Sequence, residues 1–151
     1  MVRVMASGVF DLLHPGHLYY LKEAKKLGDE LVVVVATDNT VRKRKHEPIT
    51  PQEMRLEMVE ALKPVDRAVL GREDDMFKTV EEIKPDIIAL GYDQDFDEKW
   101  LEDELKKRGM DIKVVRIGPL SADLNATRKL IQKIIDWYEF QKRMEKVEGG
   151  K

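Results

Sequence analysis

Two histidines stand three residues apart at the expected start of a helix. The segment His14-Pro15-Gly16-His17 follows an apolar run, and proline is favoured at the first position of a helix. A spacing of three places both imidazole rings on one side of the first turn, beside amide groups that have no partner within the helix. Two potential cations at the positive end of a helix dipole form a site for a polyphosphate. Gly16 lacks a side chain, so a ribose or phosphate can approach the backbone.

Two other interpretations of the histidine pair fit its context less well. A lone histidine is more often a local cap or a half-buried packing residue. Here, however, both rings follow the first strand of an α/β pattern, where such folds bind ligands. Zinc is disfavoured because two histidines without a third nitrogen or thiolate ligand rarely hold it, and the chain has no cysteine.

A dense basic run, residues 42–46, follows the second expected strand. We interpret it as a loop that closes over phosphates, since it lies at the ligand end of the sheet. A solvated surface and a nucleic-acid patch are the alternatives. Lys43 and Lys45 are both candidate phosphate contacts, and their positions in the run do not decide between them.

Short β-branched runs alternate with longer amphipathic segments along the chain. We expect strands at residues 1–6, 30–36, 68–70, 86–90 and 111–115. We expect helices at residues 18–27, 51–62, 76–83, 96–108 and 126–146, with Thr50 as the N-cap of the second and Pro51 as its first residue. This order predicts an α/β fold, a Rossmann-like, doubly wound, five-stranded parallel sheet. One domain would span residues 1–147, followed by a disordered tail at 148–151.

Composition narrows the functional classes. The 151 residues suit one domain, with 42% hydrophobic and 37% charged residues. The net charge of −2 gives no overall attraction to nucleic acid or to an anionic membrane. No run of about eighteen apolar residues occurs, and the N-terminus lacks the apolar stretch of a signal peptide. We therefore expect a cytoplasmic protein without nucleic-acid or membrane partners. A homodimer is the expected oligomer, being the commonest among soluble proteins.

The histidine segment has a recognisable pattern. Residues 8–17 resemble the G-x-F-D-x-x-H-x-G-H signature of the cytidylyltransferase-like nucleotidyltransferases. The likeness continues through residues 36–38, Lys45 with Pro48, residues 51–55 and residues 65–66. Within that class, residues 85–94 and the following Phe96-Asp97 most resemble archaeal-type FAD synthetases. The similarity covers roughly residues 1–116.

The resemblance implies adenylyl transfer from ATP to FMN, giving FAD and diphosphate. A phosphate monoester has a second pKa of about 6, so it can attack in line without a general base. The implied catalytic residues are His14, His17, Lys45 and Arg55. The histidines would donate to the α- and β-phosphates, and Lys45 and Arg55 would hold the phosphates from the opposite side. The implied nucleotide-binding residues are Val9, Phe10, Asp11, His14, Pro15, Gly16, His17, Asp38, Asp93, Gln94, Leu120, Thr127 and Arg128.

Several assignments stay open at this point. Mg²⁺ or another divalent cation should neutralise the triphosphate, with Asp11 as a candidate direct or water-mediated ligand. Asp38 is a candidate to bind a ribose hydroxyl and is equally suited to cap the next helix. Gln94 or nearby backbone groups are candidates to read the adenine edge. Residues 118–129 depart from the family pattern, since Ala126 and Arg128 replace the usual hydroxyl residues. Alternative functions are a cytidylyltransferase acting on glycerol 3-phosphate, a non-catalytic nucleotide sensor, and RNA binding through the basic run.

Overall fold

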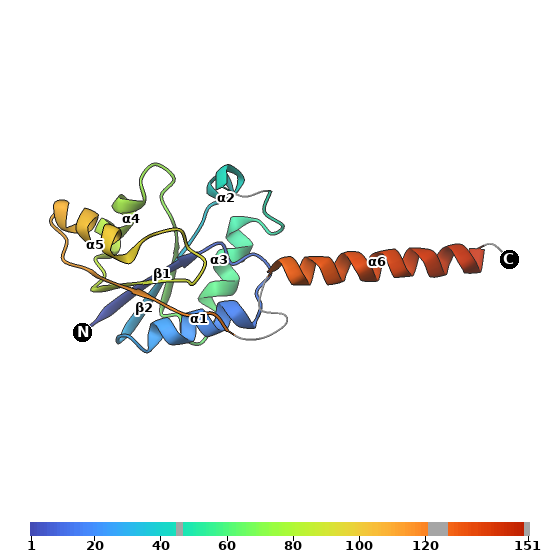
Figure 1. Cartoon of the computed structure of the whole chain (residues 1–151), viewed down its shortest axis with the longest axis horizontal. Helices are drawn as coiled ribbons and strands as arrows, with labels where there is room; N and C mark the ends of the chain where they lie inside the picture. The colour runs from blue at the N-terminus through green and yellow to red at the C-terminus, as the bar shows by residue number, and fades with distance from the viewer. Residues whose placement is uncertain (45–46, 121–126, 150–151) are drawn as a thin grey trace.

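A computed structural model describes residues 1–44, 47–120 and 127–149 of the chain. Strands and helices alternate along most of its length (Figure 1). The strands are β1 (Arg3–Gly8), β2 (Glu30–Val35), β3 (Arg67–Leu70), β4 (Ile87–Leu90) and β5 (Lys113–Arg116). The helices are α1 (Pro15–Lys25), α2 (Asp38–Arg44), α3 (Gln52–Glu60), α4 (Met76–Ile83), α5 (Glu98–Lys107) and α6 (Thr127–Gly149).

The five strands form one parallel sheet in the order β3-β2-β1-β4-β5. Strand β1 is central, with Val4 in register with Leu31 of β2 on one side and Ile87 of β4 on the other. The strand order therefore reverses between β1 and β4, and in such sheets ligands bind at the carboxyl ends of the strands beside this point. The predicted Rossmann-like, five-stranded parallel sheet is confirmed.

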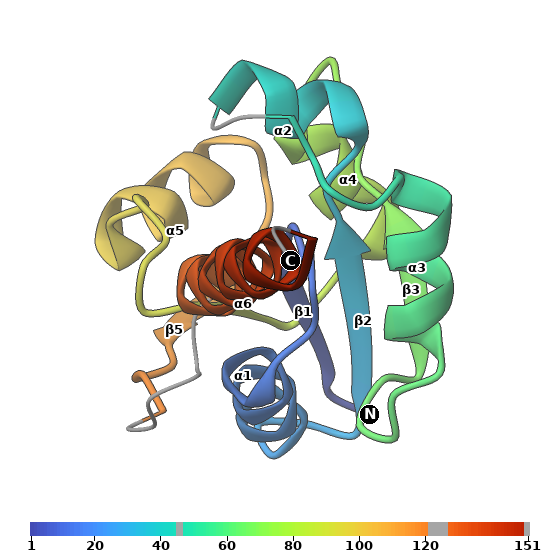
Figure 2. The same ribbon diagram turned by 90° about the vertical axis from the view of Figure 1, so that its right-hand side faces the viewer.

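Helices cover both faces of the sheet (Figure 2). Successive residues of β1 point to opposite faces, so Val4 and Ala6 pack with α1 and α3, and Met5 packs with α4 and α5. Burial on both faces explains why β2 reads as an unbroken apolar run, Leu31 to Val35, instead of an alternating one. We therefore look for the functional site at the carboxyl ends of the strands.

Several element boundaries differ from the sequence-based expectation. The prediction that Thr50 caps α3 is wrong, because Pro51 is the N-cap residue and the Thr50 hydroxyl bonds instead to Asp11. The short helix α2 was not predicted. Its first turn is held by Thr37, whose hydroxyl oxygen accepts from the amide of Thr40, so Asp38 is not the cap.

Helix α6 leaves the body at the carboxyl end of the sheet and extends away from it (Figure 1). Its start is tied to the body by the Thr127 hydroxyl, which donates to the carbonyl of Asp11 at 2.9 Å. From Gln132 onward every described residue of α6 is exposed. The helix includes Glu148 and Gly149, so these two residues do not belong to the disordered tail we expected. None of the described helices combines the length and the apolar character needed to cross a membrane.

The turn between α1 and β2 predicts a stability effect. A Cβ added at Gly28 would lie 2.7 Å from the carbonyl oxygen of Val2 and 2.8 Å from a methyl of Val4. Gly28→Ala should therefore lower the free energy of unfolding by about 1–3 kcal/mol, measured by urea denaturation. Gly118→Ala is the control, because an added Cβ there meets no atom within 4 Å. Equal losses in the two variants would contradict the prediction.

Candidate active site at the β1–α1 turn

The two histidines lie against each other at the start of α1. Their ring centroids are 3.9 Å apart, and His17 also contacts the ring of the buried Phe10 at 5.5 Å. Both imidazoles are only half-buried, and Pro15 between them is exposed. The rings are thus held at a surface instead of being packed into the core.

Backbone hydrogen bonds fix which nitrogen of each ring carries the proton. Nδ1 of His14 accepts from the amide of Gly16 at 3.0 Å, and Nδ1 of His17 accepts from the amide of His14 at 3.3 Å. This is a reciprocal capping box built from two imidazoles. An accepting Nδ1 has no proton, so each neutral ring carries its proton on Nε2. Both rings therefore present a hydrogen-bond donor at Nε2.

The same bonds correct one expectation about the helix start. Unpaired amides were expected there, but the Gly16 amide bonds to His14, and the amides of His17 and Leu18 both donate to the carbonyl of His14. Pro15 has no amide hydrogen. In addition, burial lowers the pKa of His14 from its ordinary value of 6.5. The turn therefore offers fewer free amides than expected, and the lowered pKa of His14 favours the neutral form of that ring.

The loop between β1 and α1 is strained and is held by Asp11. Phe10 and Leu12 have φ angles of 58° and 53°, a region that non-glycine residues rarely adopt and that costs about 1–3 kcal/mol each. Between them, the Asp11 carboxylate accepts from the amides of Ile49 and Thr50 and from the Thr50 hydroxyl, at 2.6–3.0 Å. Burial is the largest influence on the pKa of Asp11 and raises it, but these hydrogen bonds together outweigh burial and lower the pKa.

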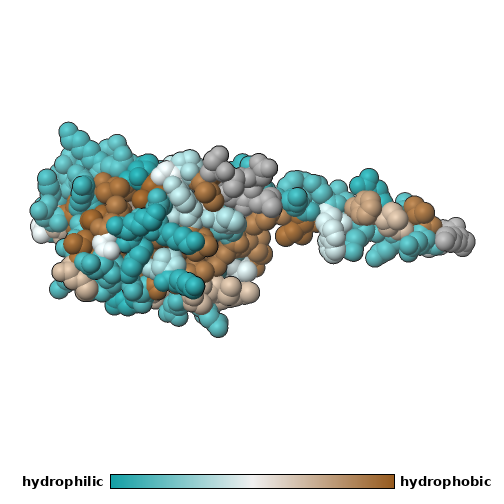
Figure 3. All heavy atoms as spheres, turned by 90° about the horizontal axis from the view of Figure 1, so that it is seen from below, coloured by the Kyte–Doolittle hydropathy of each residue, from teal (hydrophilic) through white to brown (hydrophobic). Residues whose placement is uncertain are grey.

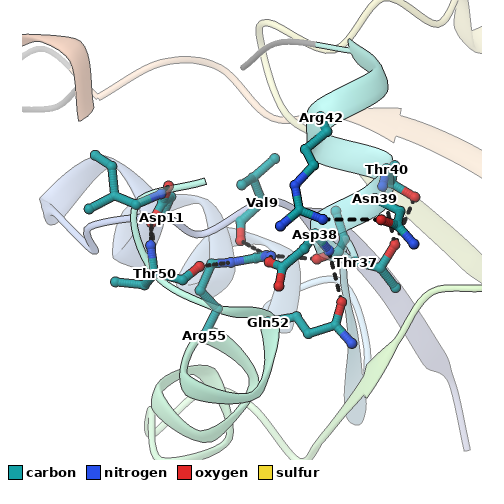
Figure 4. A network of polar contacts seen from close by, with 12 residues as sticks. Val9, Asp11, Thr37, Asp38, Asn39, Thr40, Arg42, Thr50, Gln52 and Arg55 are labelled. Atoms are coloured by element: carbon teal, nitrogen blue, oxygen red, sulfur yellow. Dashed lines mark hydrogen bonds and ion pairs between the residues drawn. The ribbon is translucent and has the colours of Figure 1, made fainter. Parts of the chain in front are cut away.

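Arg55 joins four segments beneath this loop (Figure 4). Its guanidinium is 1% exposed and donates to the carbonyls of Thr50, Val9 and Ala36 and to the carboxylate of Asp38, at 2.7–3.0 Å. We expected Arg55 to hold phosphates directly. With four of its five donors engaged inside the protein, it instead fixes the loop that carries the histidines.

Asp38 serves the same interior network. Its carboxylate pairs with Arg55 at 2.7 Å, and its amide donates to the side chain of Gln52 at 2.8 Å. The expectation that Asp38 binds a ribose hydroxyl is therefore not supported by its contacts in this structure.

The β4 segment meets β1 through Gln94. Its side-chain amide donates to the carbonyl of Ser7 at 3.1 Å and accepts from the amide of Gly91 at 2.9 Å, so Gln94 links the two strand ends and is not aimed at a base. Asp93 is exposed beside it. The residue that sequence reasoning missed is Arg116, which donates to the carbonyls of Gly91, Gln94 and Phe96 and so fixes this loop. Its place at the end of β5 gave no signal of this role.

The remaining expected residues lie on either side of the histidines. Leu120 and His14 line the same cavity of about 540 Å³ beside α1. The Thr127 hydroxyl is engaged with the Asp11 carbonyl, and Arg128 is exposed at the start of α6. Lys45 falls outside the described residues.

The described residues do not form a cage for a metal ion. No group of three or more histidine, aspartate or glutamate side chains that could hold one occurs in residues 1–44, 47–120 and 127–149. Both carboxylate oxygens of Asp11, the candidate ligand, accept hydrogen bonds from residues 49 and 50. Asp11 therefore fits an anchoring role better than direct coordination.

Fold and site together define a nucleotide-binding α/β protein. Its paired imidazoles lie at the switch point of the sheet, which is the place between β1 and β4 where the strand order reverses. The chain belongs to the cytidylyltransferase-like family, whose model matches residues 5–148. It is 65% identical to the FAD synthase of Aciduliprofundum boonei over 137 residues, which is 90% of this chain and 92% of that protein. It is 57% identical to the FAD synthase of Archaeoglobus profundus over 137 residues, covering 90% and 88%.

A solved structure supports the fold independently. A chain from Thermoplasma volcanium GSS1, described as a lipopolysaccharide core biosynthesis protein, matches with a TM-score of 0.79 and 59% identity. The match covers 80% of this chain and 99% of that chain.

The contacts of Arg55 predict which property its replacement changes. Arg55→Lys keeps the charge, but one ammonium cannot reach four separated acceptors. We expect a loss of about 2–4 kcal/mol in the free energy of unfolding, measured by urea denaturation. Arg42→Lys is the matched control, since Arg42 is exposed, and its loss should be much smaller. A raised KM for ATP with unchanged stability would instead indicate that Arg55 binds phosphate.

The lowered pKa of His14 predicts a pH dependence of stability. The folded protein resists protonating this ring, so the unfolded chain binds more protons below its ordinary pKa of 6.5. The contribution is therefore complete above pH 6.5 and is lost as the pH falls below that value. His14→Asn keeps a good N-cap but cannot titrate in this range. The difference in unfolding free energy between the protein and this variant should shrink from pH 7.5 to pH 5, and a constant difference would refute the assignment.

Proposed function

We propose that this chain is an FMN adenylyltransferase, an FAD synthase that converts ATP and FMN to FAD and diphosphate. The supporting observation is the imidazole pair, whose Nε2 donors stand at the switch point of the sheet. Identity of 65% with a protein named FAD synthase, over 90% of this chain, supports the same substrates.

The proposed reaction is one displacement at phosphorus. A phosphate oxygen of FMN attacks the α-phosphorus of ATP and forms the new P–O bond. The bond from the α-phosphorus to the bridging oxygen of the β-phosphate breaks, and diphosphate leaves with that electron pair. The attacking phosphate is already ionised at neutral pH, so no protein base is needed. The protein must align the two reactants and stabilise the negative charge that shifts to the leaving group.

His14 and His17 would supply that stabilisation. Hydrogen bonds from Nε2 to the α- and β-phosphates strengthen as charge moves onto those oxygens. The rings suit this role because backbone amides set their orientation, so no reorganisation accompanies the charge shift. Arg55 and Asp11 act as positioning residues, since their polar groups are engaged in hydrogen bonds that hold the loop.

We propose Lys45 as a further phosphate contact. It precedes residues 49 and 50, whose amides Asp11 binds. A divalent cation would neutralise the triphosphate and would be held mainly by phosphate oxygens and water. This suits a site whose described residues offer few metal ligands.

Steady-state assays with ATP or CTP, each with FMN or glycerol 3-phosphate, test the proposal. We expect FAD and diphosphate from ATP and FMN, and little product from the other pairs. His17→Asn can still accept from the His14 amide but loses the Nε2 donor. It should lower kcat by about 10²–10³ while the Kd for ATP stays nearly unchanged. FAD formation no faster than without protein would rule out the function, and unchanged kcat would rule out the role of His17.

A further inference from the structure

A second cavity lies next to the histidine loop, and the proposed mechanism does not use it. It has a volume of about 600 Å³ and lies between α3, the start of α6 and the loop after β1. Its walls include Leu12 and Leu13 from the loop, Met54 and Met58 from α3, and Ile134 and Trp137 from α6. We call it the α3–α6 cavity. Hydrophobic residues gather where α6 joins the body (Figure 3).

The chemistry of the walls suits a flat aromatic ligand. Met54, Met58 and Trp137 are each about half exposed, so apolar area here faces water. Thioether and indole groups pack well on aromatic rings. The volume is typical of cavities that take small molecules. Lys133 on the wall adds a cation that can bind a carbonyl oxygen or ring nitrogen of such a ligand.

The position of the cavity matches the length of FMN. Leu12 and Leu13 immediately precede His14, so the cavity begins within about 7 Å, measured along the backbone, of a histidine proposed to donate hydrogen bonds to phosphate. In FMN a five-carbon ribityl chain separates the phosphate from the three-ring isoalloxazine. Leu13 also lines the separate cavity that contains His14 and Leu120, so both cavities adjoin the histidine loop. The two aromatic groups of the reactants can therefore each occupy a cavity next to this loop.

We propose that the α3–α6 cavity binds the isoalloxazine ring of FMN, with Trp137 and Met58 against its faces. The inference rests on the proposed function, because that function makes FMN the acceptor. It adds a specificity role for α3 and for the first turns of α6. No described residue of α6 belongs to the buried core of the sheet.

Two variants test the cavity through steady-state kinetics. Met58→Glu places a charge on the cavity wall at an exposed position and should leave the fold intact. We expect the KM for FMN to rise at least about tenfold, while the KM for ATP changes by less than about twofold. Ile135→Glu is the control, because Ile135 is similarly exposed on α6 but does not line the cavity. Riboflavin, which lacks the phosphate, should compete with FMN and not with ATP.

A spectroscopic readout does not depend on turnover. The chain has two tryptophans, and Trp100 lies on α5, stacked on Phe96. In a Trp100→Phe background, riboflavin should quench the emission of Trp137, and Met58→Glu should remove the quenching.

The outcomes separate the two levels of the argument. Continued FAD formation with an equal KM for FMN in Met58→Glu and Ile135→Glu overturns the subsite and leaves the function standing. No FAD formation by the unmodified protein overturns the function, while quenching by riboflavin would still support a flavin site. Unchanged kinetics with a Met58→Glu shift to a smaller species in sedimentation would overturn the subsite in favour of a second copy of the chain.

Discussion

The buried guanidinium of Arg55 is the interaction on which the candidate site depends. It binds carbonyls from the loop after β1, the end of β2 and the segment before α3, and it pairs with Asp38 at the start of α2. A buried cation is stable only if its donors are satisfied, so these segments must keep their relative positions or leave a charge unpaired. Local backbone geometry at the site is thereby coupled to one side chain in the interior.

That coupling explains how the strained loop persists. Phe10 and Leu12 would leave their left-handed conformations if nothing opposed relaxation. The Phe10 ring is buried in the core, the Val9 carbonyl is bound by Arg55, and the Asp11 carboxylate binds residues 49 and 50. Strain is thus balanced by contacts on both sides of it. The loop therefore holds two imidazoles in a fixed tautomer beside the carboxyl end of β1, and donors that are fixed in advance need not reorganise when charge develops.

The fold and the centre of the site could be predicted from the sequence because both depend on local patterns. Apolar runs located the strands, and His14-Pro15-Gly16-His17 located the start of α1. The roles of Arg55 and Gln94 could not be predicted, because burial and long-range partners decide whether a polar side chain faces a ligand or the interior. The expectation that the backbone amides at the start of α1 are unpaired was wrong for a related reason. A side chain three residues away can satisfy an amide that helix geometry alone leaves open.

The sheet and its two covering layers are complete without α6, since no described residue of that helix is buried. Opening the outer turns of α6 therefore disrupts only contacts within the helix and leaves the body folded. A single helix in water has little cooperative stability of its own. Local opening of α6 accordingly requires far less of the structure to unfold than opening of β1 or β2 does. The chain thus combines a packed α/β domain, which carries the candidate site, with a projecting helix α6 whose order depends on what it contacts.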